Sequence, residues 1–331
     1  MKGLMIAALA LLTALLVFAL LAWGSVSISA GDLWRALIGS SEAQEVHRRI
    51  LYDLRLPKAL AALVAGASLA VAGLLMQTLF GNPLAGPYVL GINSGAGLGV
   101  ALLVLASGGL VTSLGGGLAL AAAAIGGAGL VLVMVVLLAE RVQSAVTLLI
   151  LGLMFGAMAN GVVSILIYFA QPDQIQAFLL WTFGSFRALG TQQLAILSAI
   201  CLPALALALL LPKPLNALLL GEEYAASMGV EVKQLRRRLL WAASLLAGAV
   251  TAFCGPIAFL GIAVPHLCRF LFKTADHRIL LPACIFLGAD MALAAEWVAG
   301  MPGSSSALPI NAILALVGAP VVFWVVLRRA P

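Results

Sequence analysis

The chain has 331 residues, of which 63% are hydrophobic and 9% are charged, whereas soluble domains carry about 25% charged residues. This composition excludes a soluble protein. The formal net charge is +6, from 18 Lys and Arg against 12 Asp and Glu, and no basic stripe with interleaved aromatic residues indicates nucleic-acid binding.

Long apolar runs recur along almost the whole chain and predict about ten transmembrane helices in a single membrane domain of all-α fold, residues 1–331. Splitting the runs at charges and at Gly and Pro clusters places the spans at 5–23, 58–80, 88–107, 115–139, 143–169, 190–211, 236–254, 256–272, 279–299 and 306–327. The first run is too long for a signal peptide and is interpreted as a retained helix. At Gly255-Pro256, one kinked helix followed by a half-span is the alternative.

The distribution of Lys and Arg predicts how these helices are oriented. An even number of spans leaves both termini on the same side. Placing the termini inside puts most of the 18 Lys and Arg residues on the cytoplasmic side, as is typical of membrane proteins. Both termini are therefore expected in the cytoplasm.

Two hydrophilic stretches interrupt the apolar runs. The cytoplasmic one, about residues 212–235, is the only long polar insertion on its side and is the expected contact for a cytoplasmic partner. The external one, about residues 24–57, predicts a short amphipathic helix lying on the bundle. Its apolar face would consist of Val46, Ile50, Leu51 and Leu54.

A broken segment follows the second apolar run. Asn82-Pro83 and Gly86-Pro87 prevent a continuous helix there. Discontinuous helices at the membrane midplane or at a mouth often line a translocation path. The 34 glycines of the chain are expected mainly at close helix contacts.

The sequence contains no motif for catalysis or for binding of ATP. It has no G-x-x-x-x-G-K-[ST] phosphate loop, no H-E-x-x-H and no G-x-S-x-G with triad partners. No catalytic residue, cofactor or metal site is therefore expected. If ATP drives this protein, ATP and Mg would be bound by partner subunits. The four cysteines lack C-x-x-C spacing and are interpreted as inert apolar residues: Cys201, Cys254, Cys268 and Cys284.

Ionisable residues inside the expected spans are few, and such groups indicate function. A proton-coupled secondary transporter would use Asp290 or Glu296 in the ninth span as its proton carrier, and it is the alternative from a different class. Arg269 has a structural interpretation, in which its side chain reaches along the cytoplasmic edge toward Asp276.

Four blocks of sequence carry a resemblance to a known family. They are RLPKALAALVAGASLAVAGLLMQTLFGNPLAGPYVLGINSGAGLG at Arg55–Gly99, GEEYAASMGV at Gly221–Val230, GPIAFLGIAVPHLCRFLFKTADHRILLP at Gly255–Pro282, and LPINAILALVGAPVVFWVVLRR at the last span. In this order they resemble the FecCD family of permeases for iron-siderophore complexes, haem and cobalamin. The blocks span nearly the whole chain.

The resemblance implies a type II ABC importer permease bundle in a bacterial inner membrane. It would be a homodimer that works with two cytoplasmic ATPase subunits and a periplasmic substrate-binding protein. The expected cargo is an iron chelate, either a siderophore complex or haem, with cobalamin as the alternative. The family's translocation path at the dimer interface maps onto Met76, Gln77, Asn82, Pro83, Asn93, Met154, Met158 and Asn160.

The block that begins at Gly221 resembles the family's coupling helix, which contacts the ATPase. Its chemistry suits that role, because acidic residues favour the positive end of a helix dipole and small residues leave a narrow surface. Glycines permit a sharp entry and a C-terminal stop. The expected coupling residues are Gly221, Glu222, Glu223, Ala225, Ala226, Ser227 and Gly229.

The resemblance also implies that external basic residues dock the binding protein, and the sequence departs from the family twice on that side. Gly300 stands where the family often has Arg, and Ala307 stands where it usually has an acidic residue. Docking is therefore expected to depend on Arg55 and Lys58. Arg55 is the stronger candidate, because a guanidinium can grip a carboxylate with two hydrogen bonds.

Overall fold

The computed structural model describes residues 1–23, 28–38, 45–106, 116–142, 144–300 and 308–329. Within them every regular element is a helix, which confirms the all-α fold. The elements are α1 (Lys2–Ala22), α2 (Ala30–Leu37), α3 (Glu45–Arg49), the π-helical turn η1 (Ile50–Arg55), α4 (Leu56–Leu79), α5 (Ile92–Leu105), α7 (Gly117–Arg141), α8 (Ala145–Phe169), α9 (Pro172–Thr182), α10 (Thr191–Leu209), α11 (Pro212–Leu218), α12 (Glu222–Ser227), α13 (Val232–Cys254), α14 (Leu260–Phe272), α15 (His277–Ala299) and α16 (Ile310–Arg329).

The number of apolar helices agrees with the number of apolar runs in the sequence. In the described part of the chain, 7 helices are long and apolar enough to cross a membrane. Three further apolar helices are shorter, namely α5, α14 and the described part of α16.

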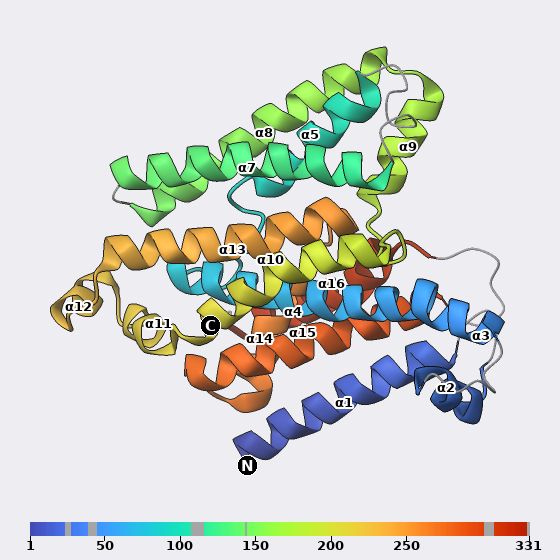
Figure 1. Ribbon diagram of the computed structural model, residues 1–331. Helices are drawn as coiled ribbons and strands as arrows, with labels where there is room; N and C mark the ends of the chain where they lie inside the picture. Colours follow the sequence, from blue (N-terminus) through green and yellow to red (C-terminus); the bar gives the residue numbers. More distant parts are fainter. Residues whose placement is uncertain (24–27, 39–44, 107–115, 143, 301–307, 330–331) are drawn as a thin grey trace.

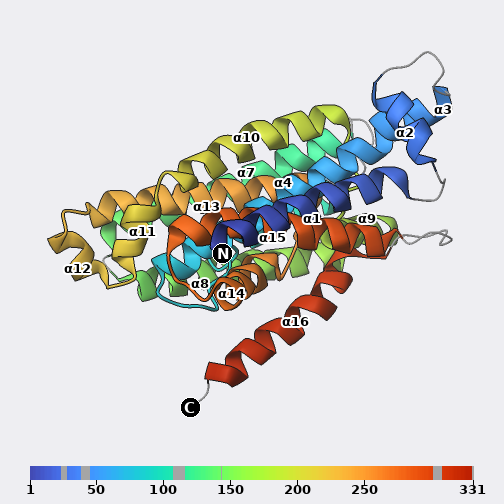
Figure 2. The ribbon, with the colours of Figure 1, turned by 90° about the horizontal axis from the view of Figure 1, so that it is seen from below.

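The long helices run side by side, with the short helices at the two ends of the bundle (Figures 1 and 2). One end carries α11 and α12, and the opposite end carries α2 and α3. Helix α4 lies at the centre, packed against α10, α13, α14 and α15, while α5, α7 and α8 form an outer layer against α13. The stretch 212–235, for which the sequence predicts contact with a partner, thus includes the α11–α12 end.

Glycine pairs bring the central helices into close contact. A Cβ atom added at Gly66 of α4 would collide with the carbonyl oxygen of Gly288 in α15. One added at Gly73 would collide with the carbonyl oxygen of Gly261 in α14. Small residues at such crossings let two backbones approach, which is the main source of attraction between helices in lipid.

The span predicted at 256–272 is shorter than expected. Helix α13 ends at Cys254, residues 255–259 are not helical, and α14 begins only at Leu260. Its 13 residues reach about 20 Å along the axis, less than a bilayer core. The half-span was the alternative interpretation of this segment, and it is the correct one.

The break before α14 is held by defined contacts. Gly255 has a φ of 74° and Phe259 a φ of 68°, a left-handed conformation that is costly for a phenylalanine. The Asn311 amide of α16 compensates by donating to the carbonyl oxygen of Pro256 (2.5 Å) and by accepting from the backbone N–H of Ala258 (2.9 Å). This side chain anchors α16 to the break.

The external segment does not form the amphipathic face predicted for it. Leu51 is fully buried, whereas Val46 and Leu54 are 64% and 66% exposed. The reason is the π-helical turn η1, which leads directly into α4. Its i→i+5 hydrogen bonds widen the turn and shift the phase of the side chains, so the 3.6-residue spacing no longer applies.

Candidate functional site

Helix α12 is a short, projecting helix at the α11–α12 end (Figure 1). Gly221 and Gly229 flank it with φ values of 103° and 84°, which only glycine adopts at little cost. Ala225 faces inward and is fully buried. The opposite side, formed by Tyr224, Ala226, Ser227 and Met228, is exposed to solvent. The sequence therefore builds a fixed helix with a narrow outward surface.

The first turn of α12 is tied to α13. The Arg236 guanidinium lies 2.7 and 2.8 Å from the two carboxylate oxygens of Glu222. Glu223, the other acidic residue predicted for this turn, is exposed. The two glutamates therefore differ in role, with Glu222 directed inward and Glu223 outward.

The C-terminal end of α4 is joined to α14 by an internal hydrogen-bond chain. The Arg269 guanidinium donates to the Gln77 side chain (2.5 Å), whose amide in turn donates to the backbone oxygen of Ile262 (3.4 Å). The expected contact of Arg269 with Asp276 stays a prediction beside this contact with Gln77. Asp276 caps α15 by accepting from the Arg278 backbone N–H.

A second hydrogen-bond chain links α11 to α4. The buried His277 ring lies 2.8 Å from the Thr78 hydroxyl and 2.8 Å from the Asn216 carbonyl oxygen. Asn216 also donates to the Asp276 carboxylate, which holds the pKa of Asp276 below its ordinary value. Asn216 and Thr78 carry no pattern that marks them in the sequence, because their role depends on contacts between distant helices.

The eight residues predicted for the translocation path differ in how far they are buried. Met76 and Gln77 are buried inside the protomer, while Pro83 and Asn93 are half-buried. Asn82 is exposed and accepts from the Leu84 backbone N–H (2.9 Å). Met154 and Met158 are exposed on one face of α8, and Asn160 is exposed on a different side of the same helix. The structure therefore does not bring all eight residues to one surface of the protomer.

Arg55 lies inside the protein and not on its external face. It is only 5% exposed, and its guanidinium donates to the backbone oxygens of Leu21 (2.7 Å) and Ala22 (3.0 Å) at the C-terminal end of α1. These are the carbonyl groups that a helix end leaves without helical partners. This burial contradicts the expected role of Arg55 as an exposed docking cation, because the cation caps a helix.

A buried carboxylate gathers two cations at the same end of the bundle. Glu296 is fully buried, with Arg187 at 2.7 Å and Lys58 at 3.5 Å. A Cβ atom added at Gly300 would collide with the Arg187 guanidinium. Arg187 therefore occupies the space that a side chain at position 300 would fill. Ala307, the other departure from the family pattern, lies outside the described residues.

Comparisons with known proteins agree with this fold and these segments. Residues 11–328 match the model of the FecCD transport family. The chain belongs to the FecCD transport family. It is 37% identical over 318 residues to the "Vitamin B12 import system permease protein BtuC" of Klebsiella pneumoniae, covering 96% of this chain and 92% of that protein. It is 35% identical over 315 residues to the "Hemin transport system permease protein HmuU" of Yersinia pestis, covering 95% and 94%.

A solved structure extends the match to three dimensions. The permease resembles a chain from "An inward-facing conformation of a putative metal-chelate type ABC transporter", with a TM-score of 0.86 and 28% identity. The match covers 98% of this chain and 99% of that one. The protein is therefore a non-catalytic, multi-pass permease subunit of a bacterial ABC importer, a class that works with ATPase and binding-protein partners.

The buried carboxyl group of Asp290 is paired locally. The Thr13 hydroxyl of α1 lies 2.6 Å from one Asp290 oxygen and 3.0 Å from the Leu9 backbone oxygen. This contact joins α1 to α15. The Asp290 carboxyl group thus takes part in the packing of two helices of the permease.

We therefore expect the Asp290→Asn permease to retain ATP-dependent uptake, because an amide can keep the contact with Thr13. Uptake into vesicles should be measured with ATP present and, separately, with an imposed pH gradient. Uptake that follows the pH gradient and ignores ATP would instead support a proton-coupled carrier.

Proposed function

We propose that this permease acts as a homodimer with two ATPase subunits and moves an iron chelate, a siderophore complex or haem, from a periplasmic binding protein into the cytoplasm. Both of its termini would lie on the cytoplasmic side of the inner membrane. The observation that carries this proposal is α12, whose buried Ala225 and exposed Ala226 give a fixed helix suited to a groove on a partner.

The exposed face of α8 supports the dimeric part of the proposal. Met154 and Met158, one helical turn apart, are 54% and 68% exposed there. Methionine is flexible and polarisable, so it suits a wall that a bulky solute must slide along. A second copy placed against this face would enclose a path between the two subunits.

Cobalamin is the second candidate cargo. The relatives in the comparison are named for vitamin B12 and for hemin at nearly equal identity, 37% and 35%. The range of the family, which includes iron-siderophore and haem permeases, supports the iron chelate. Cargo selection would rest with the binding protein, since the path residues are weakly polar or apolar.

The test is reconstitution of the permease in vesicles with its cognate ATPase and binding-protein subunits. Uptake of haemin, a ferric hydroxamate siderophore and cyanocobalamin should be compared with and without ATP. ATP-dependent uptake of either iron compound is expected. Uptake of cyanocobalamin alone would favour the second cargo, and ATP hydrolysis by the isolated permease would contradict the whole proposal.

Docking of the binding protein is proposed to use Lys58 and Arg187. Glu296 is a single buried carboxylate with two cations beside it, so one positive charge remains in excess at this surface. An acidic side chain of the binding protein would complement it. Such pairs raise association rate and specificity more than affinity.

Arg187→Gln is therefore expected to slow association of the binding protein by about tenfold at low salt, where electrostatic steering is strongest. Adding Gly300→Arg to that variant should restore the rate, because the new guanidinium would enter the space that Arg187 leaves. Arg35→Gln is the matched control, since Arg35 pairs locally with Asp32. The association rate of the binding protein should be measured by stopped-flow kinetics. An unchanged rate for Arg187→Gln would rule out this docking role.

A further inference from the structure

Arg236 lies where three elements meet at the cytoplasmic end of the bundle. It belongs to the second turn of α13, and its side chain is only 8% exposed. One guanidinium nitrogen contacts both carboxylate oxygens of Glu222 in α12, at 2.7 and 2.8 Å. The other donates to the backbone oxygen of Val142, 3.2 Å away, at the C-terminal end of α7. One side chain thus joins the coupling helix to the turn between α7 and α8.

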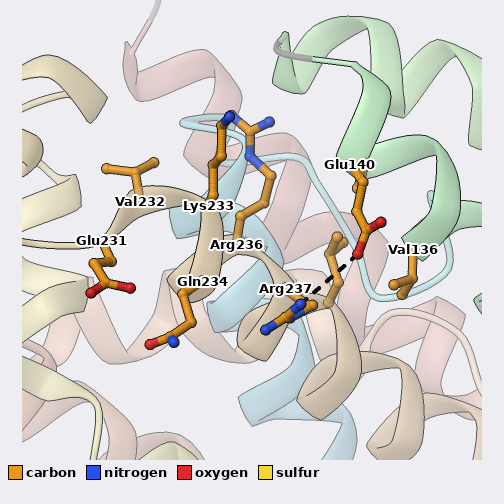
Figure 3. A pocket seen from close by; sticks show the side chains of 10 residues that line it. Val136, Glu140, Glu231, Val232, Lys233, Gln234, Arg236 and Arg237 are labelled. Atoms are coloured by element: carbon orange, nitrogen blue, oxygen red, sulfur yellow. Dashed lines mark ion pairs between the residues drawn. The ribbon is translucent and has the colours of Figure 1, made fainter.

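Arg236 and its neighbour Arg237 differ in burial. The Arg236 side chain is 8% exposed and its partner Glu222 is 42% exposed, so solvent screens this pair less than one in which both side chains are exposed. Arg237, the next residue, lies 3.9 Å from Glu140 of α7, and both side chains are more than half exposed. Figure 3 shows that Arg236 and Arg237 diverge and that only Arg237 points toward Glu140. The Arg237 pair is an exposed contact that contributes little.

A pocket of about 610 Å³, open to the surface, lies beside the Arg236 link, between α7 and α13 (Figure 3). Val136 and Ala139 of α7 and Leu240 of α13 form its apolar part, and polar and charged side chains line most of the rest. The close packing that normally resists displacement is therefore interrupted on this side of the link, where Arg236 holds the end of α7 to α13 through Val142.

Val142, which Arg236 contacts, lies two positions before Ser144, the N-cap residue of α8. Ser144 caps α8, and its hydroxyl accepts from the Thr147 backbone N–H (3.3 Å). Met154, Met158 and Asn160 lie further along the same helix. If Val142 is displaced, α8 would therefore move as one continuous helix, together with the residues of the proposed path.

We propose that Arg236 is a positioning residue that ties coupling helix α12 to the cytoplasmic base of α7 and α8, so that a displacement of α12 by the ATPase moves α8. The inference rests on the proposed importer function and adds the route by which the ATPase acts on the path. Arg236 touches neither cargo nor nucleotide. Its effect is on the coupling between ATP turnover and import.

The first experiment compares import per ATP hydrolysed in the reconstituted complex of permease, ATPase and binding protein. Haemin is the transported probe. Arg236→Gln should preserve ATP turnover, because the outer surface of α12 is unchanged, and should lower haemin import per ATP by at least about fivefold, the low end of measured couplings between sites. Arg236→Lys should be intermediate, since one ammonium cannot span both Glu222 and Val142.

Arg238→Gln is the matched control. Arg238 lies on the same helix, carries the same charge and is exposed, so import per ATP should match that of the unmodified permease. The swapped variant Glu222→Arg with Arg236→Glu should recover part of the loss, because it restores the ion pair. An unchanged ratio in Arg236→Gln, or an equal loss of ATP turnover and import, would overturn the inference. Absence of ATP-dependent import in the unmodified complex would count against the proposed function instead.

The second experiment needs no cargo. Val146 in the first turn of α8 is 63% exposed, and the four native cysteines are buried, so a spin label at Val146→Cys can be placed selectively. The distance between labels in the two copies should change when ATP and vanadate are added. In Arg236→Gln this change should shrink or vanish. A change of the same size in both proteins would show that α12 moves α8 by another route.

Discussion

Import is expected to fail when Ala226 is replaced by tryptophan. Ala226 lies on the outer surface of α12, whereas its neighbour Ala225 is fully buried. A large indole at position 226 leaves the interior untouched but collides with a partner that receives this surface. Overpacking a fitted contact costs about 1–3 kcal/mol, which is about a 5- to 150-fold loss of affinity for the ATPase.

The measurement is uptake together with co-purification of the ATPase subunits. Ala199→Trp is the matched control, because Ala199 is exposed on α10, away from α12. The control should import normally, and both variants should be present in the membrane at the level of the unmodified permease. Normal import by Ala226→Trp would mean that this surface does not meet the ATPase.

The second large effect is expected from Gly73→Ala in the centre of the bundle. The added methyl would meet the carbonyl oxygen of Gly261, and a backbone atom cannot move aside as a flexible side chain can. Helices α4 and α14 would have to separate. We expect a loss of at least about 3 kcal/mol, at the upper end of overpacking costs, and a strongly reduced yield of monodisperse permease.

Gly126→Ala tests whether the effect comes from the close contact and not from the loss of a glycine. Gly126 is exposed on α7, and nothing lies within 4 Å of a Cβ atom built there. Alanine favours a helix over glycine by about 1 kcal/mol, so this variant should be at least as stable. Thermal unfolding in detergent, followed by size-exclusion chromatography, separates the two. Equal unfolding temperatures for both variants would contradict the packing argument.

The sequence predicts the helices of this permease well, because each span must satisfy its own backbone in lipid and so shows as an apolar run. The sequence predicts the structure less well where contacts between residues far apart in the chain determine the backbone conformation. The break before the half-span α14 depends on Asn311, which lies 53 residues after Ala258 and 55 residues after Pro256. The phase of the external segment depends on one π-helical turn, which no composition rule marks.

The candidate sites, too, could be predicted where a role depends on neighbouring residues and could not where it depends on contacts with distant elements. The outward surface of α12 could be predicted, since its glycines and small residues act locally. Arg55 and Arg187 could not be distinguished by charge alone, because one caps α1 from within and the other reaches an exposed edge. Arg236 and Lys233 share a helix and a charge, yet only the contacts of Arg236 with distant elements give it a role.

The shared space of Arg187 and Gly300 restricts the order in which mutations can accumulate. A large residue at position 300 requires the Arg187 guanidinium to move away from Glu296 or Arg187 to be replaced by a shorter residue first, because both side chains would occupy the same volume. Shortening Arg187 first leaves the buried Glu296 with Lys58 as its remaining cation at 3.5 Å, and an underpaired buried charge is costly. Exchange of one external cation for the other therefore passes through a less stable intermediate. Descendants of this permease should change the two positions together or keep both.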